Sequence, residues 1–196
     1  MNNRIYKKIL TSFNLSITNY KSYYKSNHWQ RGFENKKGLF KIKNLENFRN
    51  NSLSYGLDVR VGSEDYQKKY FEELNNMISW NVIEKNLFKQ NVGNLKRCIK
   101  FKNKILDPNS LFQIYVYDLL QKNIKKKKIG LICEIGAGFG CLSRILIKNF
   151  KKAKIFIIDL PESNFLSSYF LMRHYPKKKF ILYKDIKKDK LTSNQF

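Results

Sequence analysis

The fold is decided by Ile129-Gly130-Leu131-Ile132-Cys133-Glu134, followed by Ile135-Gly136-Ala137-Gly138-Phe139-Gly140. The first part is a continuous apolar run, which is typical of a strand that is buried on both faces. The second part is a glycine loop, and the apolar spacing behind it predicts a helix over residues 140–150. A strand, a glycine loop and a helix in this order indicate a ligand site at the carboxyl end of a parallel strand.

The alternation continues along the chain. Residues 154–159 predict a second strand ending in Asp159, residues 161–175 a second helix, and residues 179–183 a third strand. Strands alternating with helices predict a parallel sheet with helices packed on its faces. We therefore expect an α/β fold, with a mainly helical N-terminal region over 1–128 and a partial Rossmann-like domain over 129–196.

The N-terminal region shows weaker patterns. Apolar spacing predicts helices over 3–25, 45–51 and 63–78. The last of these presents one apolar face, made by Tyr66, Tyr70, Phe71, Leu74, Met77 and Ile78. Residues 91–94 predict a break, and Asp107-Pro108 predicts the start of another helix because proline is tolerated in a first turn. The lysine run 125–128 marks the boundary to the second region.

The glycine spacing separates two classes of ligand. Dinucleotide-binding loops follow G-x-G-x-x-G, whereas this loop has Gly136, Gly138 and Gly140. The strand before the loop ends in Glu134, and a carboxylate gives no advantage to a pyrophosphate. It suits S-adenosylmethionine (SAM), which carries a positive amine and a sulfonium. Asp159, at the end of the second strand, suits the ribose hydroxyls of either ligand.

The pattern E-x-G-x-G-x-G resembles motif I of class I SAM-dependent methyltransferases. Residues 134–144, the Asp159-Leu160-Pro161-Glu162 turn and residues 168–171 together resemble a bacterial family of sugar O-methyltransferases. Residues 26–29 resemble the S-x-x-W element upstream in that family. The resemblance implies methyl transfer to a hydroxyl of a surface-polysaccharide sugar.

The resemblance also implies a set of cofactor-binding residues. The loop should line the amino acid tail of SAM, Glu134 should orient its amine, Asp159 should hold the ribose and Leu160 should pack on the adenine. Asp185 is expected either to contact the adenine amino group or to be a solvated turn acid. The full set is Glu134, Gly136, Ala137, Gly138, Gly140, Asp159, Leu160 and Asp185.

The catalytic group is less defined. A sugar hydroxyl needs a general base or a metal to act as a nucleophile. His28, beside Trp29, is the candidate base, against the alternative of an ordinary surface or core histidine. His174 is expected at a helix C-terminus, where the helix dipole favours a cation. We see no constellation of metal ligands, and we expect Cys133 and Cys141 to be small core residues.

The net charge is +24, from 39 Lys and Arg against 15 Asp and Glu. Most of the excess is lysine, accompanied by much asparagine and isoleucine, which favours a compositional bias over a nucleic-acid site rich in arginine. An RNA methyltransferase is the alternative, but no RNA-binding module is recognisable. The sequence shows neither a signal peptide nor a membrane span, so we expect a soluble cytoplasmic protein.

The later strands of the methyltransferase sheet have no counterpart in residues 129–196. We therefore expect either a truncated, non-catalytic chain or a chain whose sheet is completed by oligomerisation or by a partner, because unpaired strand edges favour association.

Overall fold

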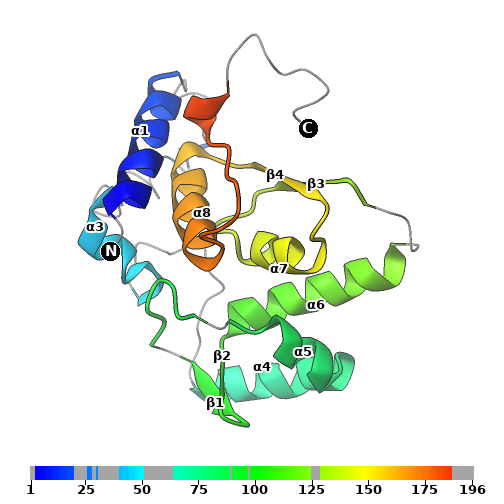
Figure 1. Ribbon diagram of the computed structural model, residues 1–196. Coiled ribbons are helices and arrows are strands. Elements are labelled where there is room, and N and C mark those ends of the chain that lie inside the picture. Colours follow the sequence, from blue (N-terminus) through cyan, green and yellow to red (C-terminus); the bar gives the residue numbers. More distant parts are fainter. Residues whose placement is uncertain are drawn as a thin grey trace.

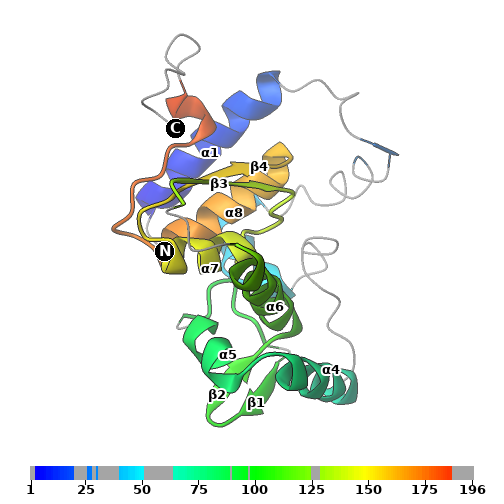
Figure 2. The ribbon, with the colours of Figure 1, turned by 90° about the vertical axis from the view of Figure 1, so that its right-hand side faces the viewer.

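The computed structural model describes residues 3–19, 26–27, 30, 40–50, 64–88, 90–96, 98–124 and 129–186. Within these ranges the protein is mixed α/β, with helices and two separate two-stranded sheets. Figure 1 and Figure 2 show the arrangement as layers. The β3–β4 pair lies above helices α7 and α8, α6 lies beneath them, and α4, α5 and the β1–β2 hairpin form the last layer.

The chain begins with helix α1 (Asn3–Asn19), as the apolar spacing predicts. Ile9 and Phe13 are buried on its inner side, whereas Ile17 is 42% exposed. This helix packs against α8. The helix predicted over 45–51 is divided in the structure into α3 (Ile42–Leu45) and the 3-10 turn η3 (Phe48–Asn50).

Helices α4 (Glu64–Met77) and α5 (Trp80–Asn86) follow. The predicted apolar face of α4 is only partly correct. Phe71, Leu74 and Ile78 are buried, but Tyr66 and Met77 are 53% and 54% exposed because they lie at the margins of the face. The sequence analysis missed α5.

A β-hairpin lies in the region that we expected to be mainly helical. Strands β1 (Ile99–Phe101) and β2 (Lys104–Leu106) pair antiparallel. Lys102 and Asn103 form the turn, with φ of +46° and +58°. Two successive residues with positive φ are the signature of a type I′ turn, which matches the twist of paired strands.

Helix α6 (Pro108–Asn123) confirms the predicted start at Asp107-Pro108. The carboxylate of Asp107 accepts a hydrogen bond from the backbone N–H of Ser110 at 2.9 Å, so it caps the helix. The same oxygen accepts a bond from Arg49 at 2.7 Å. Both side chains are only 2% exposed, which makes this a buried ion pair between η3 and α6.

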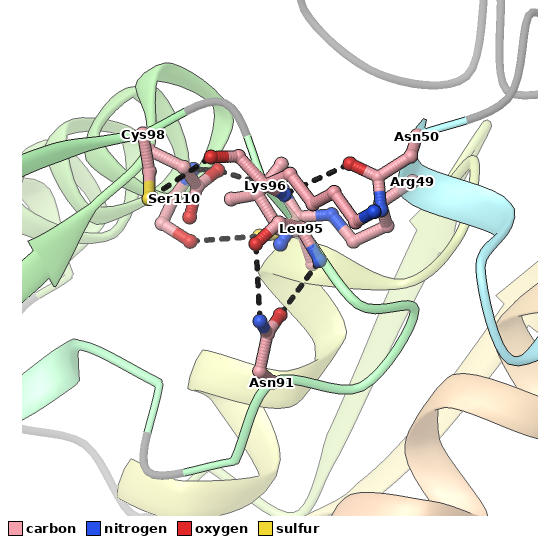
Figure 3. Close-up of polar contacts among 9 residues, drawn as sticks. Arg49, Asn50, Asn91, Leu95, Lys96, Cys98 and Ser110 are labelled. Carbon is pink, nitrogen blue, oxygen red and sulfur yellow. Dashed lines mark hydrogen bonds and ion pairs between the residues drawn. The ribbon is translucent and has the colours of Figure 1, made fainter.

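Asparagine side chains fix the predicted break at residues 91–94 (Figure 3). The Asn91 side chain both accepts from the backbone N–H of Leu95 and donates to its carbonyl, and Asn50 accepts from the N–H of Lys96. Gly93 has φ of +87°, and a Cβ there would lie 2.5 Å from the ring of Phe48. The break therefore requires glycine at this position.

The second region contains the first two predicted strands and both predicted helices. Strands β3 (Leu131–Ile135) and β4 (Lys154–Ile158) pair in parallel, with Cys133 opposite Phe156. Helices α7 (Cys141–Asn149) and α8 (Pro161–His174) follow one strand each. Ile132, Ile155 and Ile157 face these helices and pack against the core.

The other face of β3–β4 is exposed among the described residues. Leu131, Ile135 and Ile158 are 51%, 79% and 47% exposed. Cys133 lies on this face and is exposed, so the prediction that it is a core residue is wrong. The physical reason is that alternate residues of a strand point to opposite faces, and both α7 and α8 cover the face away from Cys133. Cys141 is buried, as predicted.

The third predicted strand is wrong. Residues 179–182 have no regular structure, and a short 3-10 turn, η5 (Tyr183–Asp185), follows them. Side chains of α1 bond two backbone groups of this segment. Lys8 donates to the carbonyl of Phe180 at 3.2 Å, and Ser12 accepts from the N–H of Lys184 at 3.2 Å. Leu182 is buried in the core, so burial here is achieved without a sheet partner.

Two hydrophobic clusters hold the elements together. One joins α1 and η3 to α8, and the other joins α4, α5, the hairpin and α6 to α7. Each cluster therefore contains residues from both sides of the predicted boundary at 128. In the described part of the chain, no helix is long and apolar enough to cross a membrane.

Candidate functional site

The glycine loop lies at the carboxyl ends of both parallel strands. The backbone N–H of Gly136 donates to the carbonyl of Ile158 at 2.9 Å, which extends the ladder one residue past β3. The N–H of Gly140 then donates to the carbonyl of Ala137 at 2.9 Å and closes a tight turn. The chain enters α7 directly from this turn.

Three glycines of the loop adopt backbone conformations that other residues rarely adopt. Gly136, Gly138 and Gly140 have φ of +75°, +59° and +89°. Their surroundings differ. A Cβ on Gly136 would meet nothing within 4 Å, whereas a Cβ on Gly140 would lie 3.2 Å from Cβ of Ser167 and 3.3 Å from Leu171. Gly140 lets α7 and α8 pack closely, and Gly136 leaves its backbone open to a ligand.

Glu134, near the end of β3, caps helix α7. The helix begins after Gly140, which has no side chain to cap it. The carboxylate of Glu134 accepts hydrogen bonds from the hydroxyl and from the backbone N–H of Ser143, the third residue of α7. A carboxylate at a helix N-terminus also interacts favourably with the helix dipole.

Asp159, directly after β4, ties the loop to the second helix. Its Oδ2 accepts a hydrogen bond from the N–H of Gly138 at 2.8 Å, and its Oδ1 accepts one from the N–H of Leu160 at 2.7 Å. The hydroxyl of Ser163, the third residue of α8, donates to the same carboxylate. Each acid therefore lies near the carboxyl end of one strand and bonds a serine of the helix that follows that strand.

Burial is the main cause that raises the pKa of both acids. For Glu134, the hydrogen bonds from Ser143 oppose this rise and the charge of Asp159 adds to it. For Asp159, the hydrogen bonds from Leu160, Gly138 and Ser163 oppose the rise and the charge of Glu162 adds to it. The loop thus carries a local concentration of negative charge in a strongly basic chain.

The other predicted site residues are distributed differently. Leu160 precedes α8 and packs against the hydrophobic core. Asp185 lies in η5, where its Oδ2 accepts from the N–H of Leu182 at 3.0 Å and lies 3.5 Å from Nζ of Lys8. The interpretation of Asp185 as a solvated turn acid fits these contacts better than an adenine contact. His28 lies outside the described residues.

His174 is the last residue of α8, as predicted, but it does not act as a cation there. Burial and the charges of Arg144, Arg49 and Arg173 lower its pKa from 6.5 to about 3. Its ring stacks on Phe88, with centroids 5.6 Å apart, and contacts Phe170 edge-on. It is therefore a neutral core residue at the end of α8 opposite to Asp159, and the expected stabilisation by the helix dipole is wrong.

Ser143 and Ser163 are site residues that the sequence patterns do not predict. Each serine stands at the third position of a helix that follows a strand, a position where a backbone N–H has no partner within the helix. An acid at the end of the strand followed by a serine early in the next helix is a signal that the sequence does contain. This pattern predicts the acid–serine pairs only when the first residues of the two helices are known.

Comparison with protein-family models, with curated proteins and with solved structures finds no match to this chain.

Proposed function

We propose that this chain binds SAM at the loop between β3 and α7, as the cofactor-binding part of a Rossmann-like class I methyltransferase. One observation carries the proposal. The backbone of Gly136 is open on the side where a Cβ would project, and the half-buried carboxylates of Glu134 and Asp159 flank the loop. Open glycine backbone at the carboxyl end of parallel strands is where α/β folds bind their ligands.

The sign of the local charge favours a ligand that carries a positive charge. Glu134, Asp159 and Glu162 gather at this edge, and mutual repulsion contributes to the raised pKa of the first two. A positive amine or sulfonium relieves that repulsion, whereas a pyrophosphate increases it. This distinguishes SAM from a dinucleotide.

Each loop residue has a role in the proposal. Gly136, Ala137 and Gly138 line the amino acid tail of SAM, and Glu134 orients the amine. Asp159 holds the ribose, because a carboxylate can accept about four hydrogen bonds and Gly138, Leu160 and Ser163 supply three of them. We leave Asp185 out, since Leu182 and Lys8 already engage its carboxylate.

The proposed reaction is methyl transfer to a sugar hydroxyl, which rests on the sequence resemblance. Bound by Glu134, the glycine loop and Asp159, SAM would supply an activated methyl group to the hydroxyl oxygen, and the hydroxyl proton would pass to a base. The protein contributes mainly by holding the two reactants in line. His28 is the proposed base.

A calorimetric titration tests the cofactor assignment. SAM and S-adenosylhomocysteine are expected to bind and NADH is not. Glu134→Gln, which keeps the shape and removes the charge, is expected to weaken SAM binding about tenfold. Binding of NADH without SAM would overturn the proposal. SAM binding without transfer of labelled methyl to nucleotide sugars would favour a non-catalytic chain, and transfer to RNA would favour the alternative acceptor.

The exposed face of β3–β4 supports a second part of the proposal, a partner chain or a second copy that covers it. Parallel sheets are normally covered on both faces, and Ile135 is 79% exposed here. Light scattering is expected to give a mass above that of one chain, and Ile135→Ser is expected to lower it. A mass of one chain for both proteins would exclude the second copy.

A further inference from the structure

The two acids of the site share one local arrangement. Glu134 and Asp159 stand at or just after the end of a parallel strand, and each carboxylate accepts a hydroxyl hydrogen bond from a serine in the helix that follows. Ser143 and Ser163 occupy the third position of α7 and α8. They are 0% and 2% exposed, so water does not compete for their hydroxyls.

The residues before these helices cannot supply the bond themselves. Gly140 has no side chain, and Leu160 has an apolar one; neither makes a side-chain cap. Gly140 is also fixed by its φ of +89° and by Ser167, 3.2 Å from a Cβ there. Glu134 caps α7 in place of Gly140 by accepting from the backbone N–H of Ser143, whereas Asp159 accepts from the N–H of Leu160, just before α8. In both cases the serine hydroxyl determines where the carboxylate points.

We propose that Ser143 and Ser163 are positioning residues of the ligand site, which hold the carboxylates of Glu134 and Asp159 in fixed orientations at the glycine loop before a ligand arrives. The inference rests in part on the proposed binding of SAM. The ligand then meets two oriented acids and does not have to order them, which is the general advantage of a preorganised site.

The groups that face these acids are known. Besides burial, Ser143 and Asp159 affect the pKa of Glu134. The pKa of Asp159 is likewise affected by Gly138, Leu160, Ser163 and Glu162. Of these, only the two serine hydroxyls can be removed without altering the backbone or the charge. They are therefore the cleanest positions for a test.

The experiment combines two readouts on the full chain. Carbon-13 NMR follows the titration of the Glu134 and Asp159 carboxyls, and calorimetry follows the affinity for SAM over a range of pH. Ser143→Ala is expected to raise the pKa of Glu134, because it removes a hydrogen bond to the charged form, and to weaken SAM binding about tenfold. Ser163→Ala is expected to act on Asp159 in the same way.

Two controls separate positioning from folding. Ser167, also on α8, is 3% exposed, and among the described residues its hydroxyl bonds only the backbone carbonyl of Asn164. Ser167→Ala is therefore expected to leave both readouts unchanged. Ser143→Thr and Ser143→Val have the same shape, and only the threonine keeps the hydroxyl. If Ser143→Ala does not fold, this pair gives the same comparison.

An unchanged Glu134 titration in Ser143→Ala would overturn the proposal. So would a shifted titration with unchanged SAM affinity, because Ser143 would then be a helix cap and nothing more. The NMR readout needs no ligand, so failure of the wild-type chain to bind SAM is recognised separately as failure of the proposed function.

Discussion

The carboxylate of Asp159 accepts a hydrogen bond from the backbone N–H of Gly138, with 2.8 Å between the two atoms. These residues belong to different strand–loop–helix units, so the bond joins the end of β4 to the loop behind β3. The acid therefore stabilises the loop in the absence of any ligand.

Asp159→Ala is expected to lower the free energy of unfolding by about 1–3 kcal/mol, because the half-buried N–H groups of Gly138 and Leu160 lose their acceptor. Asp159→Asn keeps one carbonyl oxygen and is expected to cost less. Urea unfolding of both variants without ligand measures the difference. Equal stability of Asp159→Ala and the wild type would show that the bond to Gly138 does not stabilise the protein. Because Asp159→Asn is expected to cost less stability, it is the better variant for tests of ligand binding.

Alanine substitution of three glycines in the second region is expected to lower the stability of the protein by different amounts, in a defined order. Gly140→Ala is expected to destabilise the protein by about 2 kcal/mol or more, because it combines a positive φ with contacts to Ser167 and Leu171. Gly136→Ala is expected to cost about 1 kcal/mol from its backbone alone. Gly130→Ala, with open space and no positive φ, is expected to stay within about 0.5 kcal/mol of the wild type. Thermal and urea unfolding rank the three, and a different order would contradict the loop geometry.

The buried pair of Arg49 and Asp107 should be sensitive to loss of one partner. Arg49→Met leaves the carboxylate of Asp107 buried without its cation, and is expected to cost about 3–5 kcal/mol. The double variant Arg49→Met with Asp107→Asn is expected to lose less than the sum of the single changes, because the uncompensated charge is gone. Additive losses in a double-mutant cycle would mean that the two side chains do not interact.

His174 should make the protein less stable in acid. Its pKa is about 3 in the folded protein against 6.5 ordinarily, so between these values the unfolded chain binds a proton that the folded chain does not. The free energy of unfolding therefore falls as the pH falls from about 6.5 towards 3. His174→Phe keeps the ring against Phe88 and is expected to reduce this loss. Urea unfolding of both proteins as a function of pH tests it, and parallel curves would show that His174 does not contribute.

The sequence predicts the second region better than the first. The continuous apolar runs 129–134 and 154–159 predict β3 and β4 because they are apolar on both faces and bounded by glycine, lysine and acid. Residues 179–183 show a similar run, but Lys8 of α1 bonds the carbonyl of Phe180 and Ser12 of α1 bonds the N–H of Lys184, just after the run. The competing partner is distant in sequence, so a local pattern does not reveal it.

The candidate site was partly predictable, because some of its residues follow a local sequence pattern and others depend on contacts that are distant in sequence. Glu134, the glycines and Asp159 are read from the order strand, loop, helix, and the structure brings them together. The exposed position of Cys133 depends on which face of the sheet the helices cover. The neutral state of His174 depends on its burial and on Arg144 and Arg49 from other elements, besides its neighbour Arg173. Apart from Arg173, these causes are distant in sequence from the residue concerned.

A matched pair of glycine variants shows whether the open backbone of the acidic loop binds SAM. Gly136→Ala and Gly130→Ala both place a methyl group in open space, but only the first places it in the loop. Calorimetric titration with SAM is expected to show binding to the wild type and to Gly130→Ala, and at least about tenfold weaker binding to Gly136→Ala, because a Cβ there obstructs close approach to the backbone. Equal affinity for all three proteins, or no binding to a folded wild type, would contradict the account.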